Sequence, residues 1–295
     1  MLKQIIVLAI LSLLTACAGQ KPLLKSGSTP RLLADSFSFT EGPAADAEGH
    51  VYFTDQPNDR IYKWDAQEGT LSVFMESAGR ANGLYFDHDG NLLAAADNKS
   101  ELWKITTDKT VQVLLTDFEG KRFNGPNDIW IAPDETIYFT DPYYQRDYWQ
   151  RSEKDIDAER VYALSTNGTV RIAATDFVKP NGIIGTPDGK TLYVADIGAD
   201  KTYAFDIAKN GDLTNKRLFV KQGSDGMTVD SRGNVYLTGK GVTIYDPKGL
   251  ELQHIPIDKD WTANVTFGGK DRKTLFITAQ QAVYLLEMNV VGPRR

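Results

Sequence analysis

The chain has 295 residues, of which 41% are hydrophobic and 24% charged, and its formal net charge is −6. This composition is ordinary for a globular protein with a large core, and an acidic chain without a Lys/Arg run argues against nucleic acid as a partner. The chain contains three histidines, none with a second His or Cys at ligand spacing: His50, His88 and His254. A His/Cys zinc site and a Ser-His-Asp triad therefore have little support. We also expect the protein to be a monomer.

The N-terminus has the anatomy of a bacterial export signal. Lys3 precedes an apolar run, residues 5–14, which is too short to span a bilayer as a mature helix and leads to Cys17, the single cysteine. The ending Leu-Thr-Ala-Cys resembles a lipobox, so residues 1–16 are predicted to be a lipoprotein signal peptide and Cys17 the lipidation site. The alternative is an ordinary signal peptide. Residues 17–30 are predicted to be a tether that leaves the protein anchored to a membrane, on the periplasmic side in a Gram-negative cell.

A pattern of about 40 to 45 residues then recurs six times. Each copy starts with Asn, Asp or Glu, continues as an apolar strand, reaches a turn seven or eight residues later, and resumes as a β-branched and aromatic strand. A third strand follows in each copy, and a fourth in the first five. The copies start at Glu41, Asn82, Asn127, Asn181, Asp225 and Asn264.

Four antiparallel strands per copy, six times over, predict an all-β fold, a six-bladed β-propeller covering residues 31–295. The alternative, an array of sandwiches, lacks any visible linker. The sixth copy runs out after its third strand, whereas residues 31–37 precede the first copy without a blade of their own. This N-terminal segment is therefore predicted to supply the outer strand of the last blade and close the ring.

The third copy carries an insertion at residues 142–159, between its second and third strands. It contains Tyr143, Tyr144, Tyr148 and Trp149. A long aromatic loop on a rigid scaffold is typical of a substrate lid, although a plain surface excursion has about equal weight.

The six starting residues are predicted to form a ring at one mouth of the propeller channel. Asn-Gly at Asn82 and Asn181 could also be a simple turn, but turns do not explain an oxygen-bearing side chain in all six copies. Hard oxygen donors that include Glu41 and Asp225 favour Ca²⁺, with Mg²⁺ or Mn²⁺ as alternatives. Four further Asp residues end second strands and are more simply explained as caps: Asp55, Asp97, Asp141 and Asp196.

At these residues the chain resembles the senescence marker protein/gluconolactonase/luciferin-regenerating enzyme family, and more narrowly bacterial gluconolactonases. The resemblance covers roughly residues 37–290. It rests on segments 39–43 (FTEGP), 120–128 (GKRFNGPND), 138–142 (YFTDP), 180–182 (PNG), 225–227 (DGM) and 277–280 (ITAQ).

The resemblance implies a six-bladed propeller with one divalent metal ion, most often Ca²⁺; Mg²⁺, Mn²⁺ and Zn²⁺ remain open. It implies Glu41, Asn181 and Asp225 as ligands, with Asn127 as a fourth ligand or a substrate contact. Asp225 would be the acid/base residue and Arg122 a substrate contact, although the spacing from Arg122 to Asn127 has extra residues. We also expect Asp128 to act as an alternative base, and Asn82 and Asn264 to contact the substrate.

These residues together predict a metal-dependent lactonase, a hydrolase that opens a sugar lactone such as gluconolactone to the aldonic acid. The metal would stabilise the oxyanion and Asp225 would activate water. Two alternatives remain open: a metal-dependent hydrolase of another ester or phosphoester, and a non-catalytic propeller that binds an envelope partner.

Overall fold

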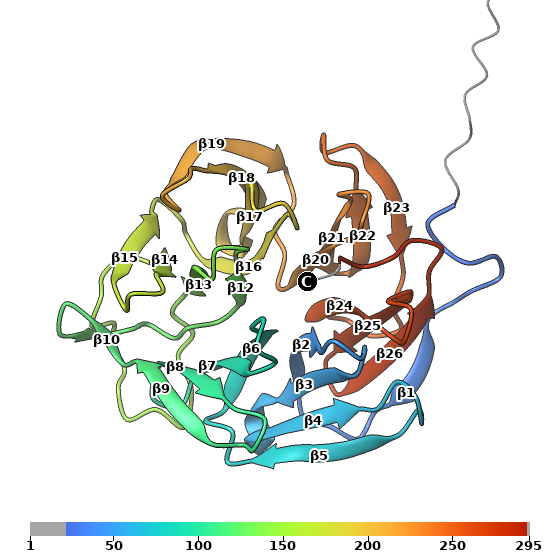
Figure 1. Cartoon of the computed structure of the whole chain (residues 1–295), viewed down its shortest axis with the longest axis horizontal. Coiled ribbons are helices and arrows are strands. Elements are labelled where there is room, and N and C mark those ends of the chain that lie inside the picture. Colours follow the sequence, from blue (N-terminus) through green and yellow to red (C-terminus); the bar gives the residue numbers. More distant parts are fainter. Residues whose placement is uncertain (1–21, 294–295) are drawn as a thin grey trace, which may run out of the picture.

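A computed structural model describes residues 22–293, which form six four-stranded antiparallel sheets around a central channel (Figure 1). In each sheet the strands follow one another from the channel outwards. The prediction of an all-β, six-bladed propeller is therefore confirmed. Cys17 and the rest of the expected signal peptide lie outside the described residues.

The first three blades follow in chain order. Blade 1 contains β2 (Thr40–Ala45), β3 (Val51–Asp55), β4 (Arg60–Trp64) and β5 (Leu71–Glu76). Blade 2 contains β6 (Ala81–Phe86), β7 (Leu92–Ala96), β8 (Glu101–Ile105) and β9 (Val111–Leu115). Blade 3 contains β12 (Ile129–Ile131), β13 (Ile137–Asp141), β14 (Arg160–Leu164) and β15 (Val170–Ala174).

The last three blades complete the ring. Blade 4 contains β16 (Pro180–Gly185), β17 (Thr191–Asp196), β18 (Lys201–Ile207) and β19 (Leu213–Val220). Blade 5 contains β20 (Met227–Val229), β21 (Val235–Gly239), β22 (Gly241–Tyr245) and β23 (Glu251–Ile255). Blade 6 contains β24 (Asn264–Gly268), β25 (Thr274–Ala279), β26 (Ala282–Glu287) and, from the other end of the chain, β1 (Arg31–Ala34).

The ring is closed by β1, as predicted. It pairs antiparallel with β26, with Arg31 opposite Leu285. The chain before β1 also contacts blade 6, because Leu23 is buried and its carbonyl oxygen accepts a hydrogen bond from the Asn289 backbone N–H at 2.8 Å. The part of the expected tether that is described, residues 22–30, thus begins against the propeller.

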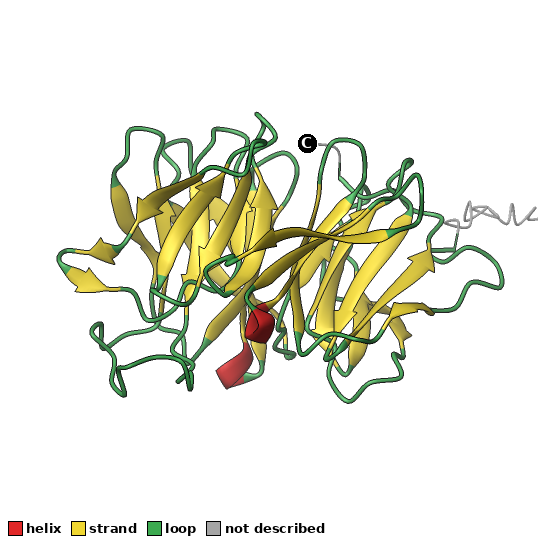
Figure 2. Cartoon of the chain, turned by 90° about the horizontal axis from the view of Figure 1, so that it is seen from below, coloured by secondary structure: helices red, strands yellow, loops and turns green. Residues whose placement is uncertain are grey.

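Three short elements lie between the blade strands. The hairpin of β10 (Asp117–Phe118) and β11 (Lys121–Arg122) joins blades 2 and 3. Two single-turn 3₁₀ helices, η1 (Gln56–Asn58) and η2 (Ile197–Ala199), follow the second strands of blades 1 and 4. Figure 2 shows both short helices on one face of the disc and the C-terminal end on the other. Within residues 22–293 no helix is long and apolar enough to cross a membrane.

The hydrophobic core lies between the blades rather than on the channel axis. Phe53 of blade 1 packs on Phe276 of blade 6, with ring centroids 5.3 Å apart. A Cβ on Gly185 of blade 4 would lie 2.1 Å from the Trp130 ring of blade 3. Close interlocking of this kind fixes each blade relative to the next and gives the channel residues a rigid frame.

Candidate active site

The residues that start the six sequence copies are crowded around the channel axis. A Cβ on Gly83 would lie 2.4 Å from the carbonyl oxygen of Asn127 in the next blade, and one on Gly226 would lie 1.9 Å from Cγ of Asn264. Glycine therefore follows these residues because the neighbouring blade packs against the backbone there. The Asn-Gly pair at Asn82 reflects this close approach rather than a hairpin turn.

Threonines on the second strands fix these positions from the side. The Thr54 hydroxyl of blade 1 donates to the carbonyl oxygen of Asn82 in blade 2 at 3.0 Å. The Thr140 hydroxyl of blade 3 donates to the carbonyl oxygen of Asn181 in blade 4 at 2.7 Å. The backbones of Asn82 and Asn181 are thus held by the neighbouring blade, and their side chains are left to face the channel.

Five of the six starting residues meet in one cavity of about 480 Å³ at the mouth that carries η1 and η2. Its walls also contain residues that the repeats did not single out. The starting residues that line it are Glu41, Asn82, Asn127, Asn181 and Asp225, and the others are Phe39, Gln56, Pro57, Tyr144, Arg146, Ile197 and Trp261.

The two carboxyl groups of the cavity, those of the buried Glu41 and the partly buried Asp225, are close enough to interact. Burial, and then the charge of Asp225, holds the pKa of Glu41 well above its usual value. Burial also raises the pKa of Asp225 to about 6, although hydrogen bonds from Trp261 and Asn181 oppose that shift. A pair of buried carboxylates without full compensation favours the uptake of a proton or a cation.

Hydrogen bonds orient the groups around Asp225. Trp261 Nε1 donates to Oδ2 at 2.6 Å, and Asn181 Nδ2 donates to Oδ1 at 2.8 Å. Asn181 Nδ2 also donates to the Tyr144 hydroxyl at 3.0 Å, so both amide hydrogens are used and the amide oxygen is left without a hydrogen-bond partner among residues 22–293. The side chains of Asn82 and Asn127 likewise make no hydrogen bond within this range.

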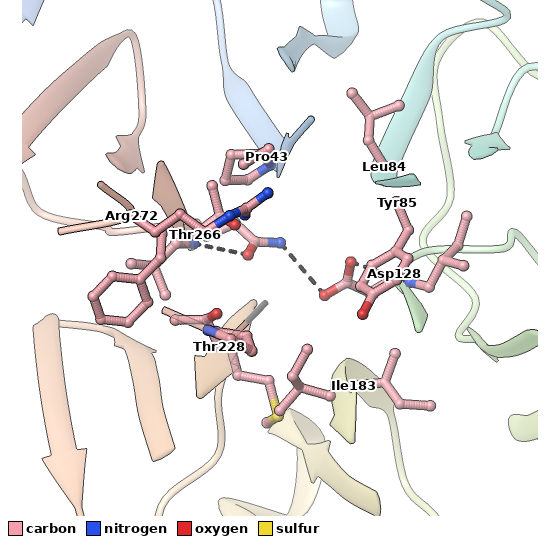
Figure 3. A pocket seen from close by; sticks show the side chains of 16 residues that line it. Pro43, Leu84, Tyr85, Asp128, Ile183, Thr228, Thr266 and Arg272 are labelled. Atoms are coloured by element: carbon pink, nitrogen blue, oxygen red, sulfur yellow. Dashed lines mark hydrogen bonds between the residues drawn. The ribbon is translucent and has the colours of Figure 1, made fainter. Parts of the chain in front are cut away.

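Asp128 and Asn264 lie elsewhere in the channel. They line a narrower cavity towards the opposite mouth, where Asn264 Nδ2 donates to Asp128 Oδ2 at 3.4 Å across the axis (Figure 3). Burial raises the pKa of Asp128 to about 7. The structure thus does not place the expected alternative base and the sixth starting residue on the wall of the larger cavity.

Arg122 is also placed away from this cavity. It ends β11, is half-exposed, and its Nε lies 3.3 Å from Asp155 Oδ2. The arginine that lines the cavity is Arg146, from the insertion at 142–159. Tyr144 comes from the same insertion, for which the sequence predicts either a substrate lid or a surface excursion.

The remaining wall residues left weaker signals in the sequence. Gln56 and Ile197 each directly follow a strand-ending Asp, so the repeat register could have found them. Trp261 stands three residues before the start of the sixth copy, in a loop without a counterpart in the other copies.

The donor set fits a hard divalent cation better than a soft one. Glu41 and Asp225 bring two carboxylates, and Asn181 and Asn127 bring amide oxygens. Within residues 22–293 there is no group of three or more His, Cys, Asp or Glu side chains placed to hold a metal ion. A metal here would therefore depend on amide, water or substrate oxygens to complete its coordination.

Comparison with known proteins assigns this geometry to a family. Residues 39–281 match the family described as SMP-30/Gluconolactonase/LRE-like region. The chain belongs to this family. The match includes all six starting residues and the whole insertion of blade 3.

The similar proteins include lactonases. The chain is 28% identical to a gluconolactonase from Zymomonas mobilis, over 90% of this chain and 83% of that one. It is 28% identical to the pentonolactonase XacC of Haloferax volcanii, over 84% of both. Homology at this level supports a lactonase, and hence a hydrolase.

Solved structures of family members share the fold. The gluconolactonase XC5397 from Xanthomonas campestris superposes with a TM-score of 0.80 at 26% identity, covering 92% of this chain and 99% of that one. A calcium-binding regucalcin from Agrobacterium tumefaciens superposes with a TM-score of 0.75 at 21% identity, covering 90% and 96%. The latter likeness concerns the fold alone.

Proposed function

We propose that the protein is a divalent-metal-dependent lactonase that opens a sugar lactone to the corresponding aldonic acid. The observation that carries the proposal is the convergence of Glu41, Asn127, Asn181 and Asp225 on one cavity in a chain related to lactonases. Two carboxylates with amide oxygens are the ligands that Ca²⁺ prefers, and Mg²⁺, Mn²⁺ and Zn²⁺ are tested beside it.

Asp225 is the group proposed to take the proton from the attacking water. Its two carboxylate oxygens are fixed by Trp261 and Asn181, so the carboxylate cannot rotate away from the cavity. Because burial raises its pKa to about 6, it is a stronger base than an exposed aspartate and is still largely ionised at neutral pH. A bound divalent ion would polarise the lactone carbonyl and lower the pKa of water.

The other walls would hold the sugar ring. Asn82 and Asn127 present amide groups without a partner among the described residues, and these can bind hydroxyl groups of the substrate. Trp261 and Tyr144 add flat apolar surface of the kind on which a sugar ring packs.

The deciding experiment is the rate of acid release from glucono-1,5-lactone. The protein would be treated with EDTA and then given Ca²⁺, Mg²⁺, Mn²⁺ or Zn²⁺ in turn. We expect the rate to fall to the spontaneous rate after EDTA and to return with at least one ion. Bound metal without any rate above the background would contradict the sugar-lactone proposal.

A second candidate substrate class, a larger and more apolar ester, is favoured by one observation. Five of the twelve residues lining the cavity are aromatic or aliphatic, or proline: Phe39, Pro57, Tyr144, Ile197 and Trp261. An aryl ester tested beside the sugar lactone would separate the two classes by the ratio of their kcat/KM values.

We also propose that the protein is exported and held on a membrane by lipid on Cys17. The support is the order of a basic start, a short apolar run and Leu-Thr-Ala-Cys. Replacing Cys17 with Ser should move the protein from the membrane fraction to the soluble fraction. Equal membrane association of both forms would contradict this proposal.

A further inference from the structure

Three of the four aspartates at the ends of second strands cap the backbone of their own blade. Asp141 accepts hydrogen bonds from the backbone N–H groups of Asn124 and Gly125, at 2.9 and 2.8 Å. Asp55 and Asp196 do the same for Ser38 and Phe39 and for Val178 and Lys179. These contacts hold the segment that leads into the innermost strand.

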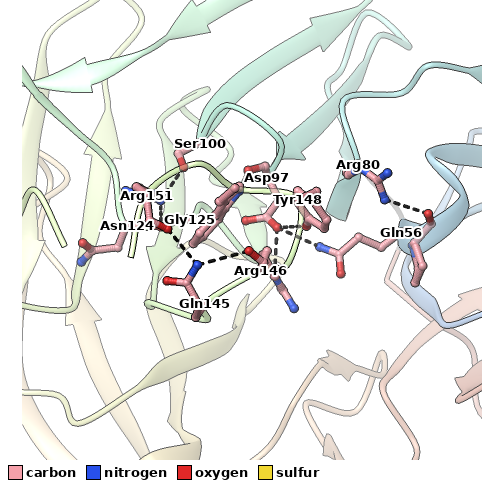
Figure 4. Close-up of polar contacts among 12 residues, drawn as sticks. Gln56, Arg80, Asp97, Ser100, Asn124, Gly125, Gln145, Arg146, Tyr148 and Arg151 are labelled. Atoms are coloured by element: carbon pink, nitrogen blue, oxygen red, sulfur yellow. Dashed lines mark hydrogen bonds and ion pairs between the residues drawn. The ribbon is translucent and has the colours of Figure 1, made fainter. Parts of the chain in front are cut away.

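Asp97, the fourth, has a different set of partners. The N–H of Arg80 in the matching segment of blade 2 already donates to Asp59, at 2.6 Å. The carboxylate of Asp97 instead accepts from Arg146 Nε at 3.0 Å, from the Tyr148 hydroxyl, and from Gln56 Nε2 at 3.3 Å (Figure 4). Two of these three donors belong to the insertion of blade 3.

The contact is part of a larger attachment of the insertion to blade 2. Trp149 Nε1 donates to the Asp97 carbonyl oxygen at 2.8 Å. Arg151 Nη2 donates to the Ser100 hydroxyl at 2.8 Å, and its guanidinium stacks on Trp149 at 4.1 Å. The Arg80 guanidinium lies 4.3 Å from the Tyr148 ring centroid. Blade 3 thus reaches over to blade 2 and is fastened there at several points.

This attachment determines what the insertion presents to the cavity. Arg146 lines the cavity and uses only Nε for Asp97, and its two terminal nitrogens have no hydrogen-bond partner among residues 22–293. Its charge is close enough to act on both Glu41 and Asp225. An arginine with one edge fixed and the other edge free is well suited to bind paired oxygen atoms of a ligand.

We infer that Arg146 is a specificity-determining residue that binds hydroxyl groups of the lactone ring, and that Asp97 is the positioning residue that holds it in the cavity. This inference rests on the proposed lactonase function. It assigns the role of substrate-binding arginine to a residue of the insertion rather than to Arg122, which pairs with Asp155 on the outer surface.

The test compares a lactone rich in hydroxyl groups with one that has none. For R146A, we expect KM for glucono-1,5-lactone to rise about tenfold, because a hydrogen bond to a charged group is lost, with kcat within about twofold. For δ-valerolactone, kcat/KM should stay within about twofold of the wild type. R146K keeps the charge but loses the planar fork, so its KM for glucono-1,5-lactone should lie between those of the wild type and R146A.

Three further variants separate positioning from general damage. D97N and Y148F weaken the attachment at residues that do not themselves line the cavity, and should raise KM for glucono-1,5-lactone in the same direction as R146A. K154A removes another cation of the insertion, one that pairs with Glu159 and does not line the cavity. It should leave KM unchanged for both lactones. R122A is the competing assignment: a rise in KM for R122A with none for R146A would overturn the inference.

Hydrogen exchange gives a readout that does not depend on catalysis. Peptides covering residues 142–159 should exchange faster in D97N and Y148F than in the wild type or K154A. Unchanged exchange in both variants would overturn the positioning role of Asp97. If the wild type opens gluconolactone but R146A lowers kcat/KM equally for both lactones, only the role of Arg146 is overturned. A wild type that opens neither lactone would overturn the proposed function and the role of Arg146 with it.

Discussion

At the scale of single residues, the chemistry of the site is decided by which atoms are already bonded. Asn181 donates its two amide hydrogens to Asp225 and Tyr144, so its amide oxygen is left without a hydrogen-bond partner among residues 22–293. Asp225 accepts at both oxygens yet keeps a raised pKa, because burial outweighs these bonds. A carboxylate that is fixed in direction and more basic than usual is the group in this cavity best suited to activate water.

The first prediction concerns Asp225. Replacing it with Asn keeps the shape but removes the base and one carboxylate, so we expect kcat for glucono-1,5-lactone to fall by about 10³-fold or more. Steady-state kinetics would measure the loss, and circular dichroism would show that the fold persists. Near-normal turnover in a folded D225N would contradict the role given to this residue.

Residue by residue, the sequence was informative only where the repeat dictated the position. Glu41 and Asp225 occupy equivalent places in the six copies, so the repeat alone predicts that they lie together. The family motif around Arg122 predicts a substrate contact. Gly120, with φ at +76°, instead turns the chain back through a hairpin that carries Arg122 outward. Arg146 and Trp261 lie outside the repeat, and their positions depend on long-range contacts.

At the scale of elements, the geometry of the cavity depends on how the innermost strands approach one another. The strand β2 changes register with β3 between Glu41 and Ala44, and β6 and β16 show the same shift beside Asn82 and Asn181. Irregularities of this kind re-aim side chains next to active sites. The glycine that follows each of these three starting residues lies where the backbone of the next blade comes close.

The second prediction concerns this packing. In G83A the new methyl group would lie 2.4 Å from the Asn127 carbonyl oxygen, so blade 3 must move. We expect a loss of about 2 kcal/mol of stability together with a clear rise in KM, measured by thermal melting and kinetics. G90A is the matched control: it strains a turn where φ is +81° but has no atom within 4 Å of the added group, so it should lose stability and keep its KM.

The elements themselves could largely be predicted, because alternation and turn residues mark each strand. A third strand follows in every blade as expected, in blade 1 as β4 (Arg60–Trp64), and the insertion lies between β13 and β14. The hairpin of β10 and β11 was not foreseen, since two-residue strands leave no periodic signal.

The third prediction tests ring closure. Chains starting at residue 22, 31 and 35 would be compared, because the last of these lacks β1 (Arg31–Ala34) and leaves the edge of β26 unpaired. Losing several backbone hydrogen bonds should lower the melting temperature by at least about 5 °C relative to the chain starting at 31, and promote aggregation through the free edge. Equal melting temperatures for the chains starting at 31 and 35 would show that β1 contributes little.

At the scale of the whole molecule, the channel has two unlike ends. One mouth holds the larger cavity with Glu41 and Asp225, and the other is narrowed by side chains that include Asp128, Asn264 and Arg272. The chain after β26 also runs to this second end, where Pro293 contributes to its wall (Figure 1). The cavity with Glu41 and Asp225 therefore lies on the face that also carries Tyr144 and Arg146 of the insertion.

The carboxyls whose pKa values are raised link stability to pH with a definite sign. Burial raises the pKa of Asp225 to about 6 and the pKa values of Asp128 and Asp141 to about 7. When the pKa of an acid is higher in the folded protein than in the unfolded chain, its contribution is favourable at low pH and is lost as pH rises through the folded value. Carboxyls with lowered pKa values, such as Asp87, act in the opposite direction only below about pH 4.

The fourth prediction follows for the protein in EDTA. Its melting temperature should fall by several degrees between pH 5 and pH 7.5, since about 1 kcal/mol moves the midpoint of a large domain by about 2–4 °C. If Ca²⁺ binds Glu41 and Asp225 as proposed, it competes with protons there and should raise the midpoint more at pH 7.5 than at pH 5. Its affinity should weaken about tenfold per unit fall in pH for each proton displaced. E41Q provides the control, because it keeps the shape of the cavity and lacks one of the two charges. A melting temperature that rises with pH in EDTA would contradict the raised pKa values of these carboxyls. A Ca²⁺ effect that is larger at pH 5 would show that they do not form the cation site.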